Sequence, residues 1–213
     1  MITTAISPYA SLVDRIVPIP KSPSINILRN LFLIVSFSIF LAVCAQAAII
    51  IPHISPVPIT LQTLSVLLTG AALGSKRGGL STVLYLTEGA AGLPIFAGGA
   101  GGFIRLFGYT GGYLWAFPIA AFVTGWLCEK HLDRNFLTCA LSMLPGTILI
   151  YILGVSWLAV ILHLNLRDAF NEGMLPFIPG DILKICTAAI LLPSVWKGIQ
   201  YVEQKKNTRQ DNL

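Results

Sequence analysis

The chain has 213 residues, of which 55% are hydrophobic and only 11% are charged, and its mean hydropathy is +0.78. Because a soluble globular domain carries about 25% charged residues, this composition excludes an ordinary soluble protein and predicts an integral membrane protein. The formal net charge of +5 comes from basic residues scattered between apolar runs, with no basic stripe, which argues against a nucleic-acid-binding protein.

The N-terminal part predicts an extension followed by a first membrane span. Residues 1–28 contain four prolines and few periodic apolar positions, so we expect a cytoplasmic extension there. An apolar run at about 30–51 is long enough to cross a bilayer, which takes about 20 residues of helix. Small residues recur along this run at helical spacing: Ser38, Ala42, Ala45 and Ala48. Such a strip lets another helix approach closely, and that helix can belong to this chain or to a partner protein.

A second, shorter span is expected at about 59–73, after a proline-rich link at 51–58. It has the polar residue Gln62 near its start. It ends in the pattern Gly70-x-x-x-Gly74, which is a helix-packing motif but is common by chance in glycine-rich membrane proteins.

The third span is expected at about 80–93, after a tight basic turn at 75–79. It holds two polar side chains, Tyr85 and Glu88, ahead of a Gly-Leu-Pro break. Polar and ionisable residues within membrane spans are uncommon and usually functional.

The most unusual segment is the glycine-rich stretch FAGGAGGFIRLFGYTGGY at 96–113. It does not contain GxGxxG after a strand, and the sequence has no GxxxxGK[ST], so neither a dinucleotide fingerprint nor an ATP-binding Walker A loop is present. We expect this segment to fold over a pocket and offer backbone N–H groups to a solute. The alternative is a flexible loop without a ligand.

Three further spans complete the pattern, at about 113–127, 136–164 and 180–202. Pro145 and Gly146 predict a kink or tilt in the long fifth span. Residues 165–179 form a predicted polar loop, and 204–213 a polar tail. Altogether we expect an all-α integral membrane protein with a bundle of six transmembrane helices over 29–203.

The basic residues predict the orientation of this bundle. Two of the fourteen, Arg105 and Arg167, lie in links on one side, and Lys184 lies within a span. The remaining eleven fall on the opposite side: Arg15, Lys21, Arg29, Lys76, Arg77, Lys130, Arg134, Lys197, Lys205, Lys206 and Arg209. Because positive residues are retained inside, we expect both termini in the cytoplasm.

Two charges stand in the last span, at the end expected to face outward. Asp181 and Lys184 are three residues apart, so they share one face of a helix. A charge inside a span costs roughly 2.5–3.5 kcal/mol, which the ion pair alone or a bound solute must offset. The candidate binding residues are Asp181, Lys184, Glu88, Arg105, Tyr85, Gln62, Phe96 and Tyr113. The alternative is a self-satisfied Asp181–Lys184 pair, with Glu88 bonded to a helix backbone.

Several motifs resemble the BioY family, the biotin-binding S components of energy-coupling-factor (ECF) transporters. They are PVPITLQT at 56–63, KRG at 76–78, GLPIFAGG at 92–99, GGY at 111–113 and PGDILK at 179–184. The resemblance covers roughly residues 30–200 in order. It implies six helices and high-affinity capture of biotin from outside the plasma (inner) membrane of a bacterium.

The resemblance also implies partners: a transmembrane T protein and two cytoplasmic ATPases that supply ATP hydrolysis. It implies that the small-residue strip of the first helix faces the T protein. Asp181 and Lys184 match the family's last-helix motif and are implied as binding residues. Our role hypothesis gives the valerate carboxylate to Lys184 with Arg105 and the ureido N–H groups to Asp181 or Glu88, although the two ends can be exchanged.

Two other functions compete with this one. A proton- or ion-coupled secondary carrier for biotin or a similar carboxylate vitamin would use Glu88, Asp181 and Lys184 as a relay, but the sequence shows no obvious inverted repeat. A membrane-embedded enzyme would need a nucleophile–base or metal pattern. His53, His131 and His163 are scattered and the cysteines form no CxxC, so we expect no catalytic residues, metal or cofactor.

Overall fold

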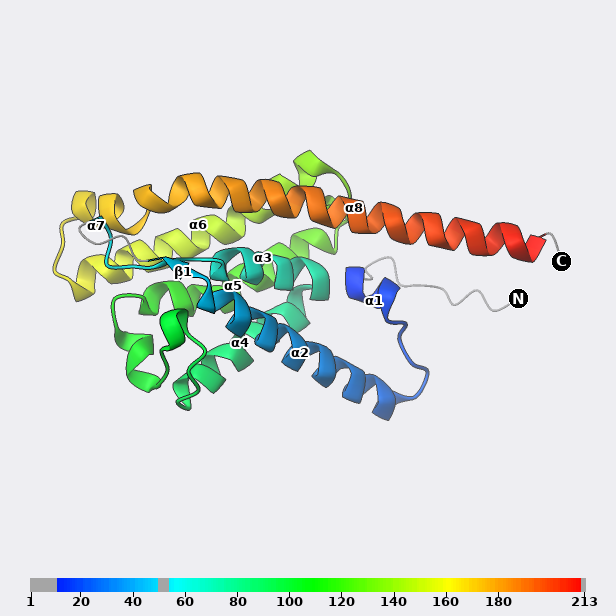
Figure 1. Cartoon of the computed structure of the whole chain (residues 1–213), viewed down its shortest axis with the longest axis horizontal. Helices are drawn as coiled ribbons and strands as arrows, with labels where there is room; N and C mark the ends of the chain where they lie inside the picture. Colours follow the sequence, from blue (N-terminus) through cyan, green and yellow to red (C-terminus); the bar gives the residue numbers. More distant parts are fainter. Residues whose placement is uncertain (1–10, 50–53, 212–213) are drawn as a thin grey trace.

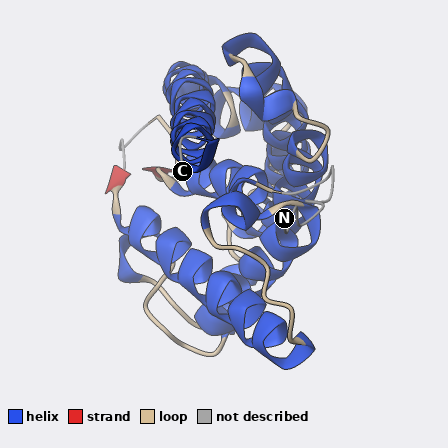
Figure 2. Ribbon diagram, turned by 90° about the vertical axis from the view of Figure 1, so that its right-hand side faces the viewer, coloured by secondary structure: helices blue, strands red, loops and turns tan. Residues whose placement is uncertain are grey.

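The computed structural model describes residues 11–49 and 54–211, and these form an elongated bundle of helices (Figure 1). Each of the six predicted spans overlaps one of the main helices: α2 (Pro23–Gln46), α3 (Gln62–Leu73), α4 (Ser75–Ala90), α5 (Gly111–Cys128), α6 (Phe136–Ile161) and α8 (Ile178–Asp211). The short elements between them are α1 (Leu12–Ile16), β1 (Ala48–Ile49), β2 (Ile59–Thr60), η1 (Ala97–Gly99), η2 (Phe103–Phe107), η3 (Leu132–Arg134), α7 (Leu166–Gly173) and η4 (Leu175–Phe177). The two strands pair antiparallel at one side of the bundle (Figure 2).

Four segments are long and apolar enough to cross a membrane: α2, α5, α6 and the stretch Leu166–Lys205, which contains most of α8. The chain is therefore a multi-pass membrane protein. Helix α3 has only 12 residues, or about 18 Å of length, against about 30 Å of hydrocarbon. The count of six spans accordingly stays a prediction.

The long axis of the bundle separates two groups of connections. Helix α1 and the C-terminal part of α8 lie at one end, which we call the basic end, whereas the glycine-rich segment and α7 lie at the opposite end (Figure 1). This is the grouping that the basic residues predicted, although the side that faces the cytoplasm remains a prediction.

Three predicted boundaries are wrong. Residues 75–79 are not a turn, because α4 begins at Ser75 and the chain reverses at Gly74, whose φ of 83° suits glycine. The predicted polar loop at 165–179 contains α7, whose start is capped by the Asn165 side chain accepting from the Asp168 N–H. Helix α8 begins at Ile178, so Pro179 lies in its first turn. N–H groups there have no acceptor within the helix, so the missing N–H of proline costs no hydrogen bond.

The small-residue strip of α2 lies mostly inside the chain. Ser38 and Ala45 are fully buried, and the Ser38 hydroxyl donates a hydrogen bond to the Glu88 carboxylate on α4. Ala42 packs against the same core, and Ala48 pairs with Thr60 in the hairpin. Ser38 and Ala45 are thus covered within this chain, and packing of the strip against a partner helix stays a prediction.

Helices α3, α4 and α5 meet at backbone distance around Gly70. A Cβ atom at Gly70 would lie 2.2 Å from the Ala121 carbonyl oxygen on α5, and one at Gly78 would lie 2.8 Å from Gly70 Cα. A Cβ at Gly125 would meet the Gly74 carbonyl carbon at 2.6 Å. Both glycines of the predicted packing motif are thus used in close helix contacts.

Part of the predicted N-terminal extension packs onto the bundle. Asp14 in α1 receives a hydrogen-bonded ion pair from Arg29 at 2.8 Å and another from Arg77 at 2.6 Å, and its side chain is only 9% exposed. Leu12 and Val13 are buried in the apolar core at the basic end. Burial by itself raises the pKa of Asp14, but the hydrogen bonds from Arg77 and Arg29 outweigh it and lower that pKa from 3.8 to about 2.

Replacing Asp14 by asparagine should destabilise the folded chain by about 3 kcal/mol or more, because two largely buried guanidinium groups lose their counter-charge. Since the folded-state pKa lies below the unfolded one, the stabilisation is complete above about pH 4 and is lost as pH falls through about 2. Thermal unfolding in detergent between pH 7 and pH 2.5 measures both effects. Glu203→Gln is the control, because its pair with Arg15 is exposed and 3.7 Å long, and an equal loss there would contradict the prediction.

Candidate functional site

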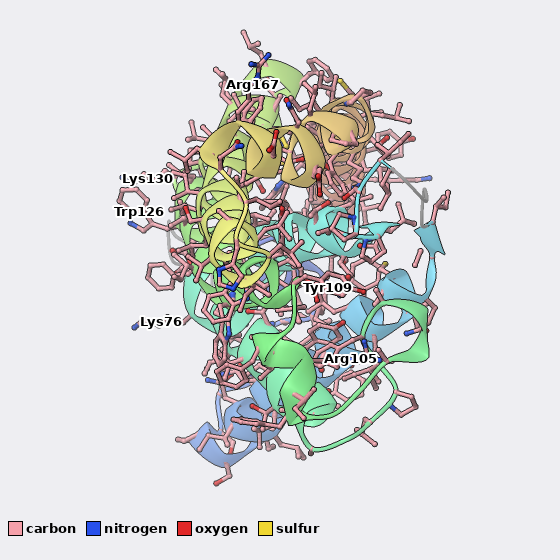
Figure 3. The ribbon with its side chains drawn as sticks, turned by 90° about the vertical axis from the view of Figure 1, so that its left-hand side faces the viewer. Lys76, Arg105, Tyr109, Trp126, Lys130 and Arg167 are labelled. Carbon is pink, nitrogen blue, oxygen red and sulfur yellow. The ribbon has the colours of Figure 1, made fainter. Side chains whose placement is uncertain are left out.

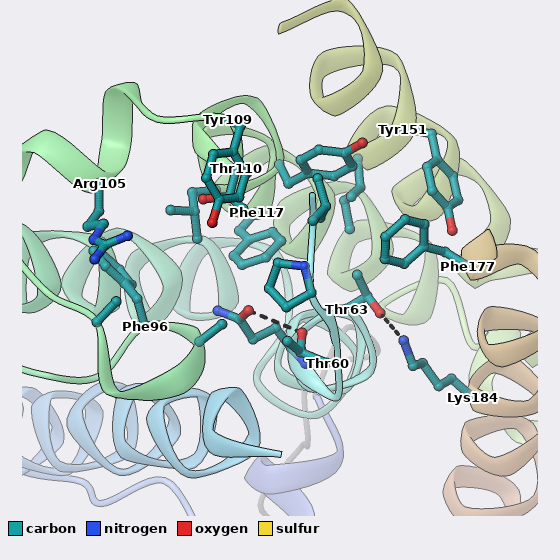
Figure 4. A pocket seen from close by; sticks show the side chains of 18 residues that line it. Thr60, Thr63, Phe96, Arg105, Tyr109, Thr110, Phe117, Tyr151, Phe177 and Lys184 are labelled. Carbon is teal, nitrogen blue, oxygen red and sulfur yellow. Dashed lines mark hydrogen bonds between the residues drawn. The ribbon is translucent and has the colours of Figure 1, made fainter. Parts of the chain in front are cut away.

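A cavity of about 780 Å³, part of it open to solvent, lies between the helices beside the glycine-rich segment (Figure 4). Its wall combines the β2–α3 corner, the glycine-rich segment, α5, α6, η4 and α8. The lining residues are Val57, Pro58, Thr60, Gln62, Thr63, Phe96, Ala97, Ala100, Arg105, Tyr109, Thr110, Tyr113, Leu114, Phe117, Ile150, Tyr151, Phe177 and Lys184.

Lys184 provides one cationic pole of the cavity. Its ammonium donates to the Asp181 carboxylate at 2.8 Å and to the Thr63 hydroxyl at 2.9 Å (Figure 4). Both charged side chains are about 10% exposed, so the pair is largely removed from water. An ammonium has three N–H donors, which leaves one for a further acceptor.

Asp181 lies behind Lys184 and does not line the cavity. One of its carboxylate oxygens accepts from Lys184 and Thr63, and the other accepts from the Tyr151 hydroxyl on α6. The carboxylate therefore fixes three side chains from three helices, α3, α6 and α8. This network brings Lys184 and Tyr151 to the same wall.

A second polar group lies at the start of α3. The Gln62 amide donates to the Tyr85 hydroxyl at 2.7 Å and accepts from the Thr60 hydroxyl at 3.1 Å. The Tyr85 hydroxyl donates in turn to the Ile95 carbonyl at 3.0 Å. Tyr85 is fully buried and lies behind Gln62, so it holds the amide in place instead of lining the cavity.

The glycine-rich segment folds over the cavity, as predicted, and is held there by two indoles. Trp115 donates to the Leu106 carbonyl and Trp157 to the Gly108 carbonyl, each at 2.9 Å. Phe107 packs its ring against both indoles. These contacts fix η2, which carries Arg105.

Arg105 provides the second cationic pole, on the opposite side of the cavity from Lys184 (Figure 4). Its side chain is exposed, and within the described ranges no carboxylate pairs with it. The apolar part of the wall between the two cations is largely aromatic: Phe96, Tyr113, Phe117 and Phe177.

Five of the eight candidate residues line the cavity, and Asp181 lies directly behind Lys184: the five are Lys184, Arg105, Gln62, Phe96 and Tyr113. Tyr85 supports Gln62 from behind. Glu88 is not brought to the cavity, because it faces α2 and accepts from Ser38. His53 lies outside the described residues, and among those described no group of three His, Cys, Asp or Glu side chains could hold a metal.

Sequence reasoning missed Tyr151, Thr60, Thr63 and Phe177 as site residues. Tyr151 carried a detectable signal, since it is a phenol in an otherwise apolar part of the fifth span. Thr63 carried none, because a threonine hydroxyl in a membrane helix usually bonds to its own backbone. Thr60 carried none either, because it lies in the short strand β2 that was not predicted.

A helical membrane bundle with two separated cations around one largely aromatic cavity is a membrane-embedded solute-binding protein. The chain belongs to the BioY family, whose pattern matches residues 15–201.

Relatives with known names agree with this assignment. The chain is 44% identical over 154 residues to the probable biotin transporter BioY of Pyrococcus horikoshii, covering 72% of this chain and 90% of that one. It is 39% identical over 158 residues to the biotin transporter BioY of Thermotoga maritima, covering 74% and 92%. A crystal structure of the S-component for biotin from an ECF-type ABC transporter matches with a TM-score of 0.75 and 26% identity, over 84% of this chain and 95% of that one.

Proposed function

We propose that this chain captures biotin with high affinity and acts as the S component of an ECF-type transporter. The relatives named as biotin transporters and the matching biotin S-component support this proposal. The observation that carries it is the cavity between Lys184 and Arg105, which suits an elongated solute with a polar group at each end.

Biotin has a neutral ureido ring at one end and a valerate carboxylate at the other. The Lys184 charge is already balanced by Asp181, whereas Arg105 has no carboxylate partner among the described residues. An incoming anion therefore gains more binding energy at Arg105 than at Lys184. A neutral ring binds better at the paired ammonium and carboxylate, because this pair can both donate and accept hydrogen bonds. Of the two arrangements left open by the sequence, we propose the one with the carboxylate at Arg105 and the ureido ring at Lys184.

The aromatic wall provides the apolar surface for the rest of the ligand. Phe96 packs edge-on against Tyr85 with ring centroids 5.5 Å apart, and Gly89 faces this ring, since a Cβ there would lie 2.1 Å from it. A thiophane ring and a methylene chain carry no strong hydrogen-bonding groups, so a wall of rings is a suitable surface for them.

The remaining components of the proposal concern energy and placement. We assign ATP hydrolysis to two cytoplasmic ATPases coupled through a transmembrane T protein, since the sequence lacks a Walker A motif. We place the chain in a bacterial plasma membrane, with the cavity toward the outside and the basic end in the cytoplasm.

Equilibrium binding of radiolabelled biotin to the purified chain tests the proposal directly. We expect retention of one biotin per chain that unlabelled biotin displaces and other vitamins do not. Uptake into vesicles should require ATP and the partner subunits. Absence of retention would contradict the proposal, and uptake by the chain alone that an uncoupler abolishes would identify a secondary carrier instead.

A further inference from the structure

The outer face of α4 and α5 carries an open groove that shares no residue with the solute cavity. About 870 Å³ of empty space, much of it open to the surroundings, lies along it. The groove is lined by Lys76, Gly79, Leu80, Val83, Pro118, Ile119 and Phe122. All of these are apolar or lack a side chain except Lys76, which stands at one end.

The groove exists because its floor has little side-chain material. Gly79 faces Pro118 and Phe122, and a Cβ at Gly79 would be in ordinary contact with both, at 3.6 and 3.7 Å. The walls, which include Leu80 and Ile119, are about half exposed. From Lys76 to Val83 the groove runs for about 10 Å along the helix axis, which suits the upper part of a flexible hydrocarbon chain.

Lys76 stands at the basic end of this groove, and Lys130 lies on the neighbouring helix end. Lys76 lies in the first turn of α4, and Lys130 follows the last turn of α5. Their chain neighbours are in direct contact, since the Ser75 N–H donates to the Glu129 carboxylate at 2.7 Å. Both lysines are exposed, and within residues 11–49 and 54–211 neither belongs to an ion pair. The carboxylate of Glu129, which precedes Lys130 in the chain, also accepts from the Ser75 hydroxyl.

An indole stands beside the two lysines. The Lys130 ammonium lies 3.5 Å from the centre of the Trp126 ring, and Trp126 as a residue is 47% exposed. In a view along the long axis, Trp126, Lys130 and Lys76 all project from the same side of the bundle (Figure 3). Exposed tryptophans of membrane proteins lie at the level of lipid headgroups, so this indole places the lysines at phosphate depth.

We propose that this face binds an anionic glycerophospholipid, with its phosphate between Lys76 and Lys130 and one acyl chain in the groove. Basic pockets between membrane helices recognise anionic headgroups, and lysine is a common phosphate ligand. A zwitterionic lipid would bring its own ammonium toward the two lysines and is therefore disfavoured. This site is independent of the proposed function, because the solute cavity lies at the other end of α5.

Native mass spectrometry of the full chain with phosphatidylglycerol and phosphatidylcholine of equal chain length tests the headgroup contacts. We expect the unmodified chain to retain phosphatidylglycerol preferentially. Since a lysine near an anionic headgroup contributes about 1 kcal/mol, each of Lys76→Gln and Lys130→Gln should weaken that preference about fivefold. The double variant Lys21→Gln, Lys197→Gln removes two charges from other exposed positions, one more than either test variant, and should leave the preference unchanged.

A second pair of variants tests the groove. Val83→Trp fills it and should reduce phosphatidylglycerol retention severalfold, whereas Ile152→Trp on α6, also exposed, should not. Biotin binding should be normal in all of these variants, which separates this inference from the proposed function. The proposal is overturned if the control variants lose as much lipid as the test variants, or if the test variants retain lipid normally. It is also overturned if the test variants lose a bound protein and keep their lipid.

Discussion

Removing the ammonium of Lys184 should weaken biotin retention at least tenfold. In Lys184→Ala, the Asp181 carboxylate keeps only the Thr63 and Tyr151 hydroxyls as donors and remains a largely buried charge without a counter-ion. Truncating one partner of such a pair typically costs 2–5 kcal/mol of binding, and 1.4 kcal/mol is already a factor of ten. Asp181→Ala should have a similar effect, because it releases both Lys184 and Tyr151 from their positions. Equilibrium binding of radiolabelled biotin measures both variants.

A double variant in which both charges are neutralised separates the effect on binding from the effect on folding. In Lys184→Met combined with Asp181→Asn, no unpaired charge is buried, so the chain should fold and still fail to retain biotin. Biotin amide, which lacks the carboxylate charge, then distinguishes the two poles. Arg105→Ala should weaken the binding of biotin and leave the binding of biotin amide unchanged, whereas Lys184→Ala should weaken the binding of both. Unchanged biotin affinity in the single variants at Lys184 and Asp181 would remove the site from this location.

Gly70→Val should destabilise the bundle by about 3 kcal/mol or more. The first carbon of the new side chain would lie 2.2 Å from the Ala121 carbonyl oxygen, and neither backbone can yield without separating α3 from α5. Overpacking that forces backbone shifts costs typically 1–3 kcal/mol and sometimes more, and here a branched side chain meets backbone atoms directly. The melting temperature in detergent measures the loss.

Gly198→Ala provides the control for this prediction. Gly198 lies in α8, and no atom stands within 4 Å of its Cβ position. Alanine favours the helix over glycine, so this variant should be neutral or slightly stabilised. A similar melting temperature for Gly70→Val and the unmodified chain would show that α3 and α5 do not pack at backbone distance.

The apolar runs were sufficient to predict the main helices, because a membrane helix satisfies its own backbone and its length is set by the bilayer. The boundaries were less predictable. Gly74 alone makes the turn that we predicted over 75–79, because a single residue with positive φ can reverse the chain. Helix α7 was missed because its exposed polar face resembles a loop when only hydropathy is considered.

The cavity wall was predictable where a charge stood in an apolar span, as at Lys184 with its partner Asp181, and where the unusual glycine-rich link carried Arg105. Glu88 shows the limit of that rule, since only the packing of α2 against α4 reveals that Ser38 is its partner. The small-residue strip had the same ambiguity. Its spacing predicted close helix contact correctly but could not say that the approaching helix was α4 of the same chain.

Helix α8 joins the two ends of the molecule without interruption, from Ile178 to Asp211. Lys184 in the cavity wall and Trp196, whose indole donates to the buried Asp133 carboxylate at 2.5 Å, lie on this one helix about 18 Å apart along its axis. Pro193 lies between these two residues and removes one N–H from the hydrogen-bond ladder of the helix. The helix therefore connects the cavity wall directly to η3, and Pro193 is the position at which that connection can bend.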